Sequence, residues 1–304
     1  MDFRTIIQEV YTDLSQTKNQ GQPASYIPEL ANVNPDKFGI HFCSLDGDHY
    51  GLGDHQEKFS CQSIIKVISL CLAFKSEGVK IWKRVGVEPS GTAFNSLVQL
   101  EYEQGIPRNP FINAGAIVIC DILLSRFNNP KKEFIEFVRH LAYNSYIDYN
   151  PKIAESEKAH AYRNAALINM MKSFDNIENP IEEVLDFYYD ICSIEMTCEE
   201  LAKTFLLFAN NGCIPSSKER IITTSQSKRI NAIMQCCGFY DEAGEFSFKV
   251  GLPGKSGVGG GIVAVHPGKY SVAVWSPPLN KKGNSYKGIL ALEMFTTKSE
   301  LSIF

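Results

Sequence analysis

Ser63-Ile64-Ile65-Lys66-Val67-Ile68-Ser69-Leu70 opens the most apolar helix expected in the chain, over residues 64–74. Ser63 and Lys66 are three positions apart, so they lie on the same face of a helix. The lysine amine can then accept the serine proton, provided that burial or cationic neighbours lower its pKa from about 10.4. Near the helix start, Ser63 also has a backbone N–H free to bind an oxyanion. The segment is therefore a candidate nucleophile and base.

The Ser-x-x-Lys pattern alone is weak evidence, because it occurs three times in this chain. Ser15/Lys18 lies at the polar end of an expected helix, and Ser225/Lys228 lies among Thr, Gln and Arg. Both pairs are expected to be solvated. Lys66 differs because its apolar neighbours leave it no route to water unless it lines a cleft. The alternative is a structural lysine that extends its amine to the surface.

A second motif, Lys255-Ser256-Gly257, is the only such triplet and is followed by Val258-Gly259-Gly260-Gly261. In serine enzymes that pair Ser-x-x-Lys with Lys-Thr/Ser-Gly, the second motif lies on a strand that lines the same cleft. Glycine-rich backbone there lets a substrate approach closely and offers N–H groups. Taken alone, the triplet is equally compatible with a bulge or turn. The two motifs together predict a serine-enzyme site of this class.

The order of the expected helices and strands predicts an α/β (α+β) fold. Helical spacing of apolar residues is found in 2–16, 64–74, 114–127, 132–142, 161–171, 181–191, 199–210 and 285–300. β-rich runs flank the Asp46-Gly47 turn within 39–52 and recur in 245–250, 262–266 and 270–275. Thr197 and Glu200 form a capping box for helix 199–210, and Gly212 stands where that helix should end.

The simplest assembly pairs the N-terminal hairpin with the C-terminal strands in one antiparallel sheet. The terminal helices would pack on this sheet, and the central helices would form an all-helical lobe. We expect a single catalytic domain, 1–304, with a sheet lobe of about 1–58 and 238–304 and a helical lobe of about 59–237. A site at the seam between the lobes is the expectation.

Composition and charge narrow the possible function classes. The 304 residues carry a formal charge of −4 without a basic run, so no nucleic-acid partner is expected. The longest apolar stretch, 112–124, is broken by Asn113, Gly115 and Asp121, so no membrane-spanning helix is expected. The nine cysteines are expected to be reduced, mostly buried thiols, and no metal site or disulfide is predicted. Without a secretory signal pattern, a cytoplasmic location is expected.

Further short motifs accompany the nucleophile segment Phe59-Ser60-Cys61-Gln62-Ser63-Ile64-Ile65-Lys66 in the chain. They are Tyr26-Ile27-Pro28-Glu29-Leu30, Glu88-Pro89-Ser90-Gly91, Asn109-Pro110-Phe111-Ile112-Asn113-Ala114-Gly115-Ala116, Leu185-Asp186-Phe187-Tyr188, Cys192-Ser193-Ile194, Cys237-Gly238-Phe239-Tyr240-Asp241, Gly251-Leu252-Pro253-Gly254-Lys255-Ser256-Gly257-Val258, Trp275-Ser276-Pro277-Pro278-Leu279 and Gly283-Asn284-Ser285. In kind and in order, over residues 20–295, this set resembles the glutaminases of the serine β-lactamase-like (DD-peptidase-like) superfamily.

The resemblance implies hydrolysis of L-glutamine to L-glutamate and ammonia through an acyl-enzyme, without a cofactor. Ser63 would be the nucleophile and Lys66 its base, and Tyr188 or Tyr240 would relay the proton. The positions that match the family's substrate contacts are Tyr26, Ser63, Asn113, Glu157, Asn164, Tyr188, Tyr240 and the backbone of Val258. Glu155 is the alternative to Glu157, because the surrounding residues diverge from the family. A homo-oligomer, either a tetramer or a dimer, is also implied.

The chemistry of free glutamine agrees with these positions. Its ammonium needs an acidic partner, for which Glu157 is the candidate, while asparagine and tyrosine groups can donate to its carboxylate and amide. A penicillin-binding or β-lactamase-like enzyme is a competing interpretation. Such enzymes normally carry a Ser-x-Asn or Tyr-x-Asn element between the two motifs. The chain has no Ser-x-Asn, and the resemblance to glutaminases leaves the tyrosine of its Tyr162-Arg163-Asn164 incidental. A catalytically inactive binding module is another, but it would be expected to have lost Ser63, Lys66 or Lys255.

Overall fold

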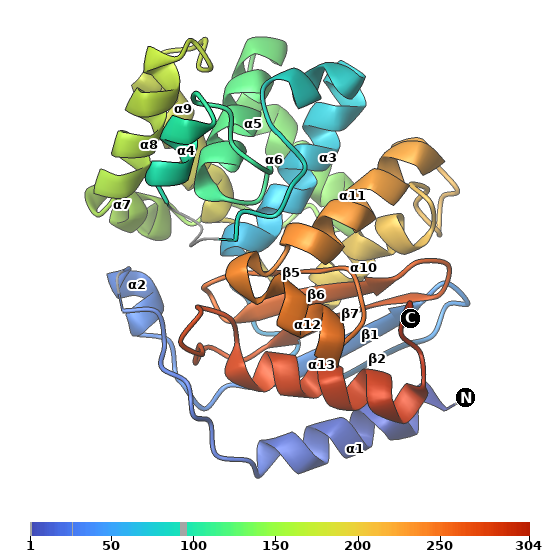
Figure 1. Ribbon diagram of the computed structural model, residues 1–304. Coiled ribbons are helices and arrows are strands. Elements are labelled where there is room, and N and C mark those ends of the chain that lie inside the picture. Colours follow the sequence, from blue (N-terminus) through green and yellow to red (C-terminus); the bar gives the residue numbers. More distant parts are fainter. Residues whose placement is uncertain (1, 26, 92–95) are drawn as a thin grey trace.

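A five-stranded antiparallel sheet runs through the lower half of the molecule in Figure 1. The computed structural model describes residues 2–25, 27–91 and 96–304. The sheet order is β2-β1-β7-β6-β5, with strands β1 (Gly39–Ser44), β2 (His49–Gly53), β5 (Gly254–Ser256), β6 (Gly261–His266) and β7 (Tyr270–Trp275). The pairing of β1 with β7 joins the N-terminal hairpin to the C-terminal strands, which confirms the predicted assembly.

Helices cover both faces of the sheet, because side chains alternate between two buried clusters. On one face, Ile40 and Phe42 of β1 pack with the terminal helices α1 (Phe3–Ser15) and α13 (Tyr286–Ser299), seen below the sheet in Figure 1. On the other face, Cys43 belongs to a cluster that includes α10 (Cys198–Ala209). Helix α10 begins at the predicted capping box, and both predicted terminal helices are confirmed.

The other elements lie mainly between the hairpin and the C-terminal strands in sequence. The helices are α2 (Pro28–Ala31), α3 (Ile65–Glu77), α4 (Val98–Tyr102), α5 (Asn113–Arg126), α6 (Pro130–Ala142), α7 (Pro151–Ala159), α8 (Tyr162–Ser173), α9 (Ile181–Cys192), α11 (Thr224–Cys237) and α12 (Ala243–Lys249). Three 3-10 turns are η1 (Gln62–Ile64), η2 (Gly78–Lys83) and η3 (Tyr240–Glu242), and a small separate sheet pairs β3 (Phe59–Ser60) with β4 (Glu195–Met196).

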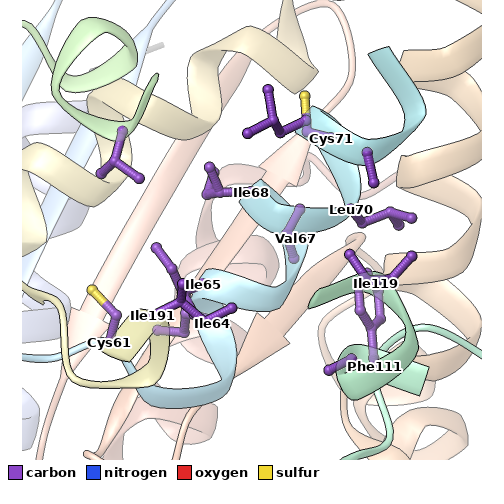
Figure 2. Packing of buried hydrophobic residues seen from close by; sticks show 14 of the residues in the cluster. Cys61, Ile64, Ile65, Val67, Ile68, Leu70, Cys71, Phe111, Ile119 and Ile191 are labelled. Atoms are coloured by element: carbon purple, nitrogen blue, oxygen red, sulfur yellow. The ribbon is translucent and has the colours of Figure 1, made fainter. Parts of the chain in front are cut away.

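Helix α3 is the centre of the helical region, and its residues 65–74 are all buried. Figure 2 shows Val67 and Leu70 turned toward Ile119 of α5, while Ile191 of α9 lies beside Ile65. A helix that is apolar on all sides is stable only when neighbours surround it completely. The packing therefore fixes the axis of α3, and with it the position of the Ser63 segment at the start of this helix.

The predicted strand over residues 245–250 is wrong, because these residues belong mostly to helix α12. Phe246 and Val250 are buried four residues apart, as on one face of a helix, and pack into the cluster below the sheet. Phe248, which an alternating strand would place on the same side, is 89% exposed. The short run Phe246-Ser247-Phe248 imitates strand alternation, whereas burial follows the helical period.

The predicted lobe boundaries, 1–58 with 238–304 and 59–237, remain a prediction about how the chain divides. Helices α3 to α9 gather above the sheet in Figure 1, and the sheet with α1, α12 and α13 forms the lower part. Within the described part of the chain, every helix is too short or too polar to cross a lipid bilayer.

Candidate active site

A pocket of about 390 Å³ opens where the helical region meets the Lys255-Ser256-Gly257 end of the sheet. Its lining includes most of the predicted site residues, namely Ser63, Asn113, Glu157, Asn164, Tyr188, Tyr240 and Val258. Tyr26, also predicted, lies outside the described residues. The other lining residues are Ile27, Gln62, His160, Ala161, Tyr162, Arg163 and Cys192. The structure therefore gathers residues that the sequence spreads over some two hundred positions.

Ser63 lies in the turn η1, immediately before α3, and is partly exposed to the pocket. Its backbone N–H makes no backbone hydrogen bond with any described residue. The preceding residue, Gln62, has a φ of 49°, a left-handed conformation that is strained for a side chain of this size. Two hydrogen bonds hold it there, from Gln62 Nε2 to Ser60 Oγ (3.0 Å) and to Glu157 Oε1 (2.7 Å). The sequence alone predicts no role for Gln62.

The glycine-rich loop after β5 rests directly on the backbone of the Ser63 segment. A methyl group at Gly257 would overlap the carbonyl oxygen of Cys61, and one at Gly259 would overlap that of Ser60. Only glycine permits this approach. It brings Val258 to the pocket, where its N–H, like that of Ser63, has no backbone acceptor among the described residues. Two unpartnered N–H groups from distant parts of the chain therefore line one pocket.

Lys66 is fully buried one helical turn beyond Ser63. Its Nζ donates to Asn113 Oδ1 (2.7 Å) and to the carbonyl oxygen of Phe111 (3.2 Å). Burial lowers the pKa of Lys66 to about 8, against a weaker opposing effect of nearby acidic groups. The alternative of an amine that reaches the surface is therefore wrong, because the amine ends inside the protein.

Lys255 is a second fully buried amine. Its Nζ donates to the carbonyl oxygens of Gly238 (2.9 Å) and Ser256 (2.7 Å) and lies 4.2 Å from the ring centre of Tyr240. Burial, with the nearby charge of Lys66, holds the pKa of Lys255 well below its usual value. Because its partners lie on β5 and just before η3, this lysine ties the Tyr240 turn to the motif strand.

Tyr240 is buried and shares a side-chain hydrogen bond with Ser63. Its φ of 56° is again in the left-handed region, so the turn η3 is strained in order to present this ring. Tyr188 of α9 is also buried, and Lys66 Nζ lies 5.7 Å from its ring centre and 6.0 Å from that of Tyr240. Burial raises the pKa of both phenols, so both remain protonated at neutral pH.

Glu157 lies on α7, partly buried, with one oxygen bonded to Gln62. Burial raises its pKa to about 7, and this outweighs the lowering effects of Gln62 and Lys66. Glu155, the alternative acid, is exposed. The sequence held a signal for α7 that was not used, since Asn150 caps its start and Pro151 is its first residue.

Asn113 connects the amine of Lys66 to the outer part of the pocket. Its Oδ1 accepts from Lys66, and its Nδ2 donates to Asn164 Oδ1 (3.0 Å) at the start of α8. Asn164 itself lines the pocket, where its amide can meet a ligand. Arg163, part of the Tyr162-Arg163-Asn164 run, and His160 also line the pocket, and the sequence predicted no role for either side chain.

Comparison with known proteins identifies relatives along the whole chain. A family model described as Glutaminase matches residues 21–304. Glutaminases from Saccharophagus degradans and Christiangramia forsetii are 59% and 54% identical, and each alignment covers all of this chain and at least 99% of the relative.

Solved structures give the same result. A probable glutaminase named ybaS aligns over 100% of this chain and 99% of its own, with a TM-score of 0.93 and 30% identity. A probable glutaminase from Bacillus subtilis aligns over 99% and 96%, with a TM-score of 0.87 and 32% identity. The shared architecture is the serine β-lactamase-like fold. From sequence and structure together, the chain belongs to the glutaminase family.

Proposed function

We propose that this chain hydrolyses the side-chain amide of L-glutamine with Ser63 as nucleophile and Lys66 as its base. The observation that carries the proposal is the buried Lys66 amine, whose pKa burial lowers to about 8, one helical turn from a serine that lines the pocket. One relative of known structure, Mglu, was crystallised in its glutamate form, and this supports a product of that kind. The chain keeps Ser63, Lys66 and Lys255, which an inactive module would not need.

In the acylation step, neutral Lys66 accepts the Ser63 proton as the hydroxyl oxygen attacks the amide carbon. A neutral amine has two N–H donors and one lone pair. Asn113 Oδ1 and the carbonyl of Phe111 accept the two N–H groups, so the lone pair remains for the serine proton. The N–H groups of Ser63 and Val258 would bind the oxyanion that forms.

The tetrahedral intermediate then breaks its C–N bond, and the leaving nitrogen takes up a proton and departs as ammonia. Tyr240 is hydrogen-bonded to Ser63 and stays protonated, so it can pass the proton held by Lys66 to that nitrogen. Tyr188 is the alternative relay. A water molecule next attacks the glutamyl ester, gives its proton back through the same groups, and releases glutamate and free Ser63.

Recognition of free glutamine would divide its two charges between opposite partners. We assign the ammonium to Glu157 and the carboxylate to Asn164 and the other uncharged donors of the pocket. A bound ammonium would keep Glu157 ionised, against the burial that raises its pKa to about 7. Asparagine is one methylene shorter, so its amide would fall short of Ser63 when its ammonium is held at Glu157.

Replacing Glu157 by glutamine should raise KM for glutamine about ten- to a hundredfold, because a charge-assisted hydrogen bond contributes about 1.5 to 3 kcal/mol. The new amide oxygen can still accept from Gln62, so the nucleophile segment should keep its conformation. Steady-state kinetics with an ammonia assay measures the effect. Glu155→Gln, two residues away and exposed, is the matched control and should behave like wild type. A silent Glu157→Gln with a crippled Glu155→Gln would transfer the role to Glu155.

The pH dependence should show both titrations. Lys66 acts as base only when neutral, so kcat should rise with pH through about 8 and level off above it. Glu157 binds ammonium only when ionised, so KM should increase as pH falls through about 7. In Glu157→Gln the increase of KM at low pH should disappear, while the rise of kcat with pH should remain. A kcat that is flat between about pH 6 and 9, with chemistry limiting, would rule out a lysine base.

Two properties rest on the family resemblance and on composition. We propose a homo-oligomer, a tetramer or a dimer, which light scattering on the purified chain would measure. We also propose a cytoplasmic location, which agrees with nine free cysteines, seven of them buried. An ammonia-release assay with glutamine and a hydrolysis assay with a penicillin would separate the glutaminase from the β-lactamase-like alternative.

A further inference from the structure

His41, His55 and Glu199 meet away from the residues that line the Ser63 pocket. One ring nitrogen of each histidine and one carboxylate oxygen of Glu199 lie within 4.8 Å of one another. The two Nδ1 atoms of the histidines are 3.1 Å apart. His41 is only 3% exposed, and its Nε2 has no hydrogen-bond partner among the described residues. Its side chain makes its polar contact through Nδ1, with His55.

Three separate elements bring these side chains together. His41 is in the middle of β1, His55 follows the end of β2, and Glu199 lies in the first turn of α10. Gly51 of β2 pairs with His41 across the hairpin. A methyl group at Gly51 would overlap Nδ1 of both histidines, so the absence of a side chain there creates the space that the two rings share.

Neighbouring side chains hold the carboxylate in place, as second contacts do around metal ligands. Lys203 Nζ donates to Glu199 Oε1 (2.5 Å), and Gln56 Nε2 donates to Glu199 Oε2 (3.3 Å). Histidine nitrogens and carboxylate oxygens are common ligands of transition metals.

We propose that His41, His55 and Glu199 bind one divalent transition-metal ion of the zinc class. A zinc ion about 2.0 to 2.1 Å from each nitrogen would subtend about 100° between atoms 3.1 Å apart, close to the tetrahedral angle. Water would complete the coordination. The partly exposed faces of His55 and Glu199 give the ion a path from solvent.

The bound ion would connect the hairpin, the loop after β2 and the start of α10. That loop runs on into β3, which leads to the Ser63 turn. The ion would therefore stabilise the base of the nucleophile segment without taking part in the reaction. His41 and His55 are 14 residues apart in sequence, and His55 and Glu199 are 144 apart, so no short ligand spacing in the sequence indicates this site.

Cobalt(II) and zinc(II), added to metal-free protein in a phosphine reductant, test the site. We expect one equivalent per chain by titration calorimetry. Cobalt should give visible d–d absorption without the near-ultraviolet charge-transfer band of a thiolate ligand, because imidazole and carboxylate are the ligands. Zinc should also raise Tm by a few degrees.

His55→Gln and Glu199→Gln, at partly exposed positions, should weaken zinc binding at least about tenfold and remove the shift in Tm. His140→Gln is the matched control, since His140 pairs with Glu219 at 2.8 Å without a second histidine, and it should bind zinc like wild type. The proposal fails if wild type binds no zinc, if a thiolate band appears, or if His55→Gln binds zinc as tightly as wild type.

Discussion

We expect Ser63→Ala to lower kcat for glutamine hydrolysis by at least about a thousandfold while the chain stays folded. In the proposed mechanism the pocket would lose its nucleophile, and the oxyanion donors would have no covalent intermediate to stabilise. Ser63 is partly exposed and its loss removes only a hydroxyl hydrogen-bonded to Tyr240, so packing around α3 is retained. Ammonia release measures the activity, and near-ultraviolet circular dichroism with Tm measures the fold.

One of the two other Ser-x-x-Lys serines provides the control for this substitution. Ser225→Ala, in α11, should have wild-type activity, because Ser225 is solvated. An electrophilic glutamine analogue should add its mass to the wild-type peptide that contains Ser63 and to no peptide of Ser63→Ala. More than a trace of turnover in a properly folded Ser63→Ala protein, or a label on another peptide, would remove Ser63 from the nucleophile role.

Lys66→Met is expected to lower kcat about 10²- to 10⁴-fold, the range that a positioned general base contributes. Methionine keeps most of the buried volume and removes the amine. Asn113 Oδ1 and the carbonyl of Phe111 lose their donor, so the free energy of unfolding should fall by about 1 to 3 kcal/mol. Chemical denaturation measures that loss separately from activity.

The pH dependence of the residual activity of Lys66→Met tests the role of Lys66 more directly than the size of the loss. Its kcat should no longer rise through pH 8, because the group with the lowered pKa is gone. Lys228→Met, at an exposed position of α11, is the matched control and should keep both the activity and the pH profile. A Lys66→Met protein that retains the rise through pH 8 would assign that titration to another group, with Lys255, whose pKa burial also lowers, the first candidate.

Much of the fold could be predicted because its signals are local. The Asp46-Gly47 turn, the capping box at Thr197 and the all-apolar run of α3 each depend on a few adjacent residues, and each is found in the structure. The strand prediction for 245–250 was wrong because six residues are too few to distinguish the period of a strand from that of a helix. Phe246 and Val250 are buried on one face of helix α12.

The site was predictable only as far as motifs and family resemblance extend. Motifs and family resemblance do not show that Gln62 adopts a left-handed backbone conformation. That conformation is held by hydrogen bonds to Ser60 and to Glu157, and Glu157 is distant in sequence. The meeting of His41 with Glu199 likewise depends on how α10 lies on the sheet, a tertiary arrangement that no short sequence window contains.

The pairing of β1 with β7 has a consequence for synthesis on the ribosome. The hairpin of β1 and β2 emerges early, but β7 lies about 230 residues later, at Tyr270–Trp275. At roughly 5 to 20 residues per second, β1 waits about 10 to 50 seconds with one edge unpaired. All six residues of β1 are buried in the finished protein, so the unpaired strand also exposes the apolar side chains of Ile40, Phe42 and Cys43. Such an edge pairs readily with other chains, and we expect the nascent protein to need a chaperone until its last strands arrive.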